Sequence, residues 1–139
     1  MAETVSVTSL SEHELAEAKD LDRRLCEAIG RKDPDAFMAC FWDNPDLVVV
    51  IAGTVQKGPA AVRSGIKELF DQNESVRLEV NEVTYLRSGD GIIGVGTATF
   101  DLKPVNAQRH LMVERWSDLR RRIDGRWVYV LNHTTMVPK

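Results

Sequence analysis

The last third of the chain constrains the fold most, because it holds two long strand-like segments joined by a two-residue Asp124-Gly125 turn. Asp-Gly between alternating hydrophobic residues is the strongest short-range signal for a β-hairpin. A tight turn also predicts which residues of the two strands face each other. The predicted facing pairs are Ile123 with Arg126, Arg122 with Trp127, Trp116 with His133, and Glu114 with Thr135.

Both faces of this predicted hairpin are substantially apolar. A sheet with one face in water would alternate apolar and polar side chains, so each face here needs a cover. We expect helices on one face and a second surface on the other. The first face carries His110, Met112, Glu114, Trp116, Trp127, Tyr129, Leu131, His133 and Thr135, and the second carries Leu111, Val113, Arg115, Val128, Val130, Asn132, Thr134 and Met136.

Three helices are predicted ahead of the long strands. The first has an N-cap at Ser9, a capping box completed by Glu12, and an end at Gly30. A second, short helix follows Asp33-Pro34 and a third follows Gly58-Pro59, since proline suits the first helical turn. Apolar residues recur every three or four positions through each of these segments, as a helix with one buried face requires.

Strand patterns occupy residues 47–51, 54–56, 76–85 and 92–102 before the terminal hairpin. Helices and strands that do not alternate indicate the α+β class, with helices packed on one face of a curved antiparallel sheet. Gly94 and Gly96 lie on one face of the 92–102 segment and mark a bend or a close backbone approach. Such a sheet, wrapped on three helices, forms a cone with a cavity.

The composition narrows the function classes. The length of 139 residues predicts one domain over 9–139, after a flexible arm at 1–8. The net charge of −3, with acids and bases interspersed, gives no basic surface of the kind that binds nucleic acid. The run from Arg120 to Arg122 indicates the solvent-exposed end of a strand rather than a site for a phosphate group. No apolar run suits a membrane span. Cys26 and Cys40 lack metal-site spacing and indicate a cytoplasmic protein with reduced thiols.

Several stretches together carry a family resemblance: Lys32-Asp33-Pro34, Phe41-Trp42-Asp43, Gly53 through Lys57-Gly58, Asp124-Gly125-Arg126-Trp127 and Asn132-His133-Thr134-Thr135. In these the chain resembles the nuclear transport factor 2-like (NTF2-like) superfamily, in particular its SnoaL-like and ketosteroid-isomerase-like branch. The resemblance implies a cystatin-like cone and a function drawn from isomerases, dehydratases, cyclases, hydrolases or association domains. The position of the ketosteroid isomerase general base falls at about Ile51, which has no titratable proton.

Two sets of side chains are candidates for a site. The predicted register places His133 near Glu114, and a carboxylate beside an imidazole is a common acid/base pair, so the catalytic candidates are His133, Glu114 and His110. Trp42, Tyr85 and Trp116 are the candidates for binding a ligand. The competing interpretations are a structural histidine with ion-pair partners and aromatic side chains that simply fill the core.

Two functions remain open from the sequence. The first is a protein that binds a small apolar organic molecule and acts on it as a cofactor-independent isomerase, dehydratase or hydrolase, with no metal. The second is a non-catalytic module that forms homo-oligomers. Because one apolar face of the hairpin points away from the helices in either orientation, we expect a homodimer or a larger oligomer through that face.

Overall fold

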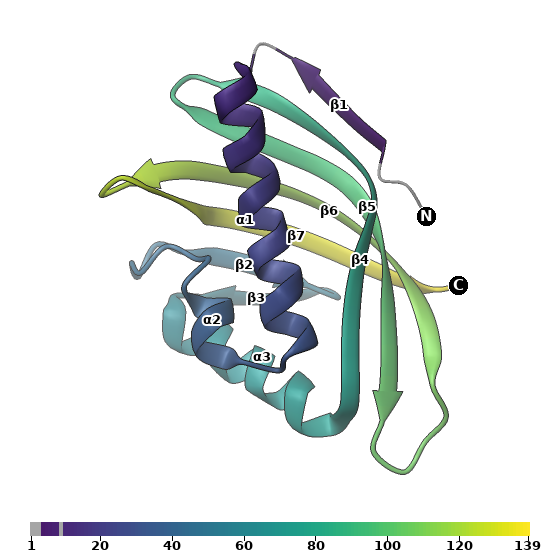
Figure 1. Cartoon of the computed structure of the whole chain (residues 1–139). Helices are drawn as coiled ribbons and strands as arrows, with labels where there is room; N and C mark the ends of the chain where they lie inside the picture. The colour runs from purple at the N-terminus through teal and green to yellow at the C-terminus, as the bar shows by residue number, and fades with distance from the viewer. Residues whose placement is uncertain (1–3, 9) are drawn as a thin grey trace.

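A computed structural model describes residues 4–8 and 10–139 of the chain (Figure 1). Within these residues, the helices are α1 (Glu12–Gly30), α2 (Pro34–Met38) and α3 (Pro59–Gln72). The strands in the same residues are β1 (Thr4–Thr8), β2 (Val48–Ile51), β3 (Thr54–Lys57), β4 (Asn73–Ser88), β5 (Gly91–Pro104), β6 (His110–Ile123) and β7 (Arg126–Pro138). This element order confirms the predicted α+β class.

The strands of the described residues form one curved sheet in the order β1-β4-β5-β6-β7-β2-β3. The four long strands are antiparallel, as predicted, whereas β2 pairs with β7 in parallel. Thr4–Thr8, within the predicted flexible arm, pair in parallel with Glu82–Leu86 as the edge strand β1. Residues 1–3 lie outside the described part.

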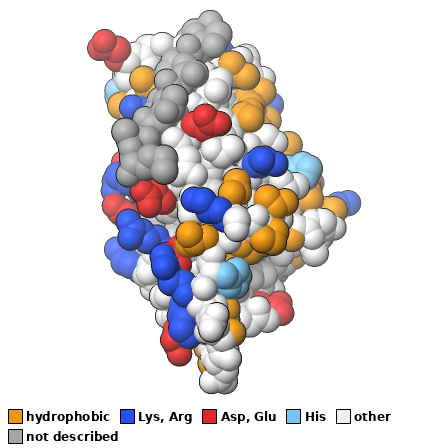
Figure 2. All heavy atoms as spheres, turned by 90° about the vertical axis from the view of Figure 1, so that its right-hand side faces the viewer, with side chains coloured by type: hydrophobic (Ala, Val, Ile, Leu, Met, Phe, Trp, Pro, Cys, Tyr) orange, Lys and Arg blue, Asp and Glu red, His pale blue; other side chains and the backbone are white. Residues whose placement is uncertain are grey.

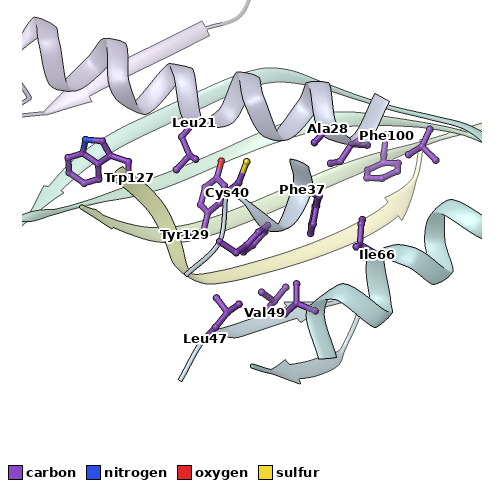
Figure 3. Close-up of a cluster of buried hydrophobic side chains, with 14 of the residues drawn as sticks. Leu21, Ala28, Phe37, Cys40, Leu47, Val49, Ile66, Phe100, Trp127 and Tyr129 are labelled. Atoms are coloured by element: carbon purple, nitrogen blue, oxygen red, sulfur yellow. The ribbon is translucent and has the colours of Figure 1, made fainter. Parts of the chain in front are cut away.

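The three helices cover the inner face of the sheet, with α1 lying across the long strands (Figure 1). The capping box that begins α1 is formed by Ser11 and Glu14, two residues after the predicted one. Ser9, the predicted cap, lies outside the described residues. Between helices and sheet lies the hydrophobic core (Figure 3), which includes Leu21, Ala28, Phe37, Cys40, Leu47, Val49, Ile66, Phe100, Trp127 and Tyr129.

The Asp124-Gly125 turn is the tight hairpin that the sequence predicts. Both turn residues have positive φ, 52° and 79°, as a type I′ turn requires. Ile123 pairs with Arg126, and Arg122 with Trp127, which confirms the register next to the turn.

Farther from the turn the predicted register is wrong by one residue. Arg120 pairs with Tyr129 but Leu119 pairs with Leu131, so Val130 is an extra residue in β7 and forms a β-bulge. Side chains of a strand point alternately to the two faces of a sheet, so one extra residue turns every later side chain of that strand to the opposite face. The observed pairs beyond the bulge are Trp116 with Thr134 and Glu114 with Met136.

Gly94 and Gly96 of β5 make room for side chains of β6. A Cβ atom at Gly96 would lie 2.4 Å from the carbonyl oxygen of Glu82 and 2.6 Å from the ring of Trp116. A Cβ atom at Gly94 would lie 2.6 Å from the guanidinium of Arg120. The close backbone approach expected at these glycines is therefore present, and it lies beside the bulge of β4.

Candidate functional site

A cavity of about 400 Å³ lies between the inner face of the sheet and the three helices. Its walls are mainly apolar, and its volume is within the range of pockets for small organic ligands. The apolar lining consists of Leu25 and Ile29 of α1, Phe37 and the adjoining Phe41, Val62, Ile66 and Leu69 of α3, Val49, Ile51 and Ala52, and Leu78, Phe100 and Met136 of the long strands.

Four polar side chains of the sheet line this cavity: Glu114 of β6, Asn132 and Thr134 of β7, and Gln56 of β3. They share the inner face because of the register, in which Val49 pairs with both Asn132 and Gln56. The Thr134 hydroxyl donates to Asn132 Oδ1 at 2.8 Å, which leaves the amide N–H groups of Asn132 as donors. The polar groups thus form two poles, one around Glu114 and Asn132 and one at Gln56.

The carboxyl group of Glu114 is suited to proton transfer. Burial raises the pKa of Glu114 from 4.5 to about 7, against a smaller opposing effect of the nearby Thr134 hydroxyl. Its Oε2 atom is buried and has no hydrogen-bond partner among the described residues. A carboxyl group that is half protonated near neutral pH can act as an acid or as a base.

A second, smaller cavity of about 30 Å³ lies on the α1 side of Glu114. Glu114 and Asn132 line both cavities, and the smaller one is completed mainly by Asp22, Cys26, Trp116 and Tyr129. The site therefore extends from the apolar cavity toward a buried cluster of charged and aromatic side chains.

This cluster is centred on Arg120, which is fully buried rather than solvated as the sequence predicted. Its guanidinium donates to both carboxylate oxygens of Asp118, at 3.0 and 2.8 Å, and lies 3.1 Å from Asp22. The hydroxyl groups of Tyr85 and Tyr129 also donate to Asp22. Burial opposes the charge of Arg120, but attraction to Asp118 and Asp22 keeps its pKa well above the ordinary value.

The buried cluster fastens α1 to the sheet. Arg120 donates to the Ala18 carbonyl oxygen of α1 at 2.9 Å, and Asp22 of the same helix takes hydrogen bonds from β4 and β7. Trp116 belongs to the same cluster, because its indole N–H donates to Asp118 at 2.9 Å. These contacts fix the wall from which Leu25 and Ile29 reach the cavity.

Two of the predicted site residues lie at the cavities. Glu114 lines both, and Trp116 lines the smaller one. Tyr85, another candidate for binding a ligand, lines neither cavity and donates its hydroxyl to Asp22. Trp42 is partly buried against the core and lines neither cavity.

Both predicted histidines lie outside the site. His133 is exposed on the outer face of the sheet, opposite Ser117, because the bulge at Val130 reverses its direction. The predicted pairing of His133 with Glu114 is therefore wrong. His110 is exposed at the start of β6, where its Nδ1 lies 3.5 Å from the carbonyl oxygen of Gln108.

Sequence reasoning missed Asn132, Thr134 and Gln56. The first two were assigned to the opposite face from Glu114, and the bulge that moves them has no recognisable sequence signal in a segment with two apolar faces. Gln56 lies in a short edge strand, where a lone polar residue is ordinarily solvated. The described residues contain no cluster of His, Cys, Asp or Glu that could hold a metal ion.

A curved sheet wrapped on helices around an apolar cavity is the architecture of NTF2-like proteins. Residues 23–130 match the family model of the SnoaL-like domain, and the chain therefore belongs to the SnoaL-like family. No curated protein matches the chain.

Solved structures share this fold at low sequence identity. A candidate aromatic ring hydroxylase from Novosphingobium aromaticivorans has a TM-score of 0.84 at 16% identity, covering 94% of this chain and 96% of its own. A candidate dehydratase of the NTF2-like family from Streptomyces avermitilis has a TM-score of 0.78 at 16% identity, with 92% and 99% covered. A candidate calcium/calmodulin-dependent protein kinase II association domain from Xanthomonas campestris has a TM-score of 0.79 at 17% identity, with 99% and 96% covered.

Proposed function

We propose that the protein binds a small, uncharged organic molecule in the apolar cavity and acts on it by acid/base chemistry at Glu114, without a cofactor. The observation that carries the proposal is a buried carboxyl group with a pKa of about 7 and an unpartnered oxygen inside a cavity of about 400 Å³. Structural carboxyl groups that are buried to this extent usually have a cation or several donors beside them.

The arrangement of Glu114 and Asn132 supports proton transfer next to a carbonyl group. The Glu114 carboxylate takes a proton from a carbon adjacent to the ligand's carbonyl, and the electron pair of that C–H bond forms an enolate. An Asn132 N–H donates to the enolate oxygen, where negative charge develops. If a C=C bond follows that carbon, the enolate is conjugated with it, and returning the proton to the far carbon of the C=C bond moves the double bond and completes an isomerisation.

The same enolate also permits a dehydration. If a hydroxyl group is bonded to the next carbon, the enolate electrons form a C=C bond as the C–O bond breaks, and the departing hydroxyl takes the proton from Glu114 to leave as water. Solved structures of the same fold include a protein designated as a candidate dehydratase. Hydrolysis, the third reaction type expected from the sequence, would require water as a co-substrate.

A two-stage experiment tests this function. A thermal-shift screen of uncharged cyclic ketones first identifies ligands that stabilise the folded state. Exchange of the ketone α-protons with solvent D₂O, followed by proton NMR, then measures proton transfer directly. Glu114→Gln should still bind the ketones but slow the exchange about 100-fold or more. Exchange that is as fast in this variant as in the wild type would contradict the proposal.

The outer face of the sheet supports a second inference, a homodimer. Val95, Leu131 and Val137 are exposed there at 44%, 42% and 43%, and the partly buried Leu119 and Val113 adjoin them through the strand pairing. Figure 2 shows hydrophobic side chains gathered on this side of the molecule among Arg, Lys and His. Large apolar side chains gathered on an exposed sheet face are typical of a surface that associates with another protein.

The partner inferred for this face is a second copy of the chain. The surrounding arginines, such as Arg115, and the acidic groups nearby supply both signs of charge for a two-fold interface. The apolar cavity with its buried carboxyl has no role in a pure association module, so the dimer accompanies the ligand-binding function rather than replacing it.

The expected location remains the cytoplasm. Cys26 and Cys40 form no disulfide, as in proteins of reducing compartments. None of the helices in the described residues is long and apolar enough to span a membrane.

A further inference from the structure

Gln56 of β3 carries the second polar pole of the cavity. Its side chain lines the cavity from the β3 wall, two strands away from Asn132 in the same row of the sheet. Its Oε1 atom is buried and accepts no hydrogen bond from the described residues. Buried carbonyl oxygens in folded proteins nearly always have a donor, so an unpaired one on a residue that lines the cavity points to a donor on the ligand.

The helix packed against Gln56 has a glycine where an alanine would be expected to stabilise it. Gly65 lies in the interior of α3, where glycine is the least favourable residue apart from proline. A Cβ atom at this position would lie 2.3 Å from Gln56 Nε2 and 3.1 Å from its Cδ atom. Gly65 therefore leaves the space in which the whole Gln56 amide lies against α3 at the cavity wall.

The charges around the cavity limit the ligand further. Among the described residues that line it there is no Lys, Arg or His, whereas Glu114 and Glu68 both contribute carboxyl groups. An acidic ligand would meet no cation and would be repelled by these groups. The lack of a cation thus disfavours an anionic ligand, and the mainly apolar walls disfavour a charged ligand of either sign.

Building on the function proposed above, we propose that Gln56 is a specificity-determining residue that accepts a hydrogen bond from a hydroxyl group of the ligand. The ligand class is a cyclic ketone with a hydroxyl group at the end remote from its carbonyl. The carbonyl lies at Glu114 and Asn132, the hydroxyl at Gln56, and the apolar rings between them contact the aromatic and aliphatic walls. The hydroxyl takes no part in the chemistry and serves to orient the ring system.

Three bicyclic probes of one skeleton test this assignment. 1-Tetralone has the carbonyl alone, 6-hydroxy-1-tetralone adds a donor, and 6-methoxy-1-tetralone adds an oxygen that cannot donate. Dissociation constants are measured by calorimetry for the wild type, Gln56→Met and Gly65→Ala. Gln56→Met keeps the length of the side chain, and Gly65→Ala displaces the Gln56 amide while raising the intrinsic helix propensity of α3.

The wild type should bind the hydroxy probe about tenfold more tightly than the methoxy probe, the size of one net hydrogen bond. Both variants should bind the three probes with nearly equal affinity, and Glu114→Gln should retain the preference for the hydroxyl. Equal binding of the hydroxy and methoxy probes by the wild type would overturn the role of Gln56 and leave the proposed function standing. Failure of all three probes to bind the wild type would overturn both.

Discussion

Replacing Glu114 by Gln should make the folded protein more stable near neutral pH but not at acidic pH. The carboxyl group is buried in the cavity wall, so its ionisation in the folded state is costly. Glutamine has nearly the same size and shape but never ionises. The variant therefore removes the cost of the buried charge while keeping the packing of the cavity wall.

The expected magnitude follows from the pKa of Glu114, which is 4.5 ordinarily and about 7 in the folded protein. Between these values the folded state binds more protons than the unfolded state, so the wild type loses stability as pH rises through this window. Each pH unit in the window removes about 1.4 kcal/mol, which sums to roughly 3 kcal/mol by pH 8. Below pH 4.5 the carboxyl is neutral in both states and the cost vanishes.

Urea denaturation followed by tryptophan fluorescence at pH 5, 6, 7 and 8 measures this difference. The stability of Glu114→Gln relative to the wild type should increase steadily from pH 5 and level off above pH 7. Glu82→Gln, which removes an exposed carboxyl group from β4, is the matched control and should change stability by less than about 0.5 kcal/mol. A difference that is independent of pH, or one that favours the wild type as pH rises, would refute the reasoning.

Three further predictions concern the fold and the outer face. Gly96→Val should destabilise the protein by about 1–3 kcal/mol or prevent folding, because its Cβ would meet the Glu82 carbonyl oxygen. Gly30→Ala, with no atom near its added Cβ, is the thermal-melt control. Arg120→Met should cost about 3–5 kcal/mol by leaving buried carboxylates unpaired, whereas Arg122→Met, at an exposed pair with Glu17, should cost under about 1 kcal/mol in urea. Leu131→Asp should dissociate the inferred dimer in sedimentation without unfolding the protein, whereas the control Val105→Asp in the β5–β6 loop should leave the dimer intact. A wild-type protein that sediments as a monomer at micromolar concentration would contradict the dimer.

The local signals in the sequence predicted most of the fold. The Asp124-Gly125 turn, the prolines at the starts of α2 and α3, and the alternation in the long strands each reflect short-range backbone chemistry that one sequence displays directly. The edge strand β1 was missed because its pairing depends on the open edge of β4, which is a tertiary feature.

The candidate site could be predicted only in part, and the reason is a single residue. The bulge at Val130 exchanges the two faces of β7, so His133 points outward and Asn132 and Thr134 point into the cavity. Alternation could not reveal the change, since both faces of the hairpin are apolar. Glu114 was placed correctly relative to Trp116, because both lie in β6, which the bulge in β7 does not alter.

The central claim is that a carboxyl group titrating near neutral pH lies inside a ligand-binding apolar cavity. Carbon-detected NMR of glutamate carboxyl groups, with Glu114→Gln to assign the resonance, measures that titration with and without 1-tetralone. The predicted midpoint for Glu114 is near pH 7 in the free protein. It should be higher with the ketone bound, because the apolar ligand excludes water from the carboxyl group. A midpoint near 4.5 that the ketone leaves unchanged would contradict the account.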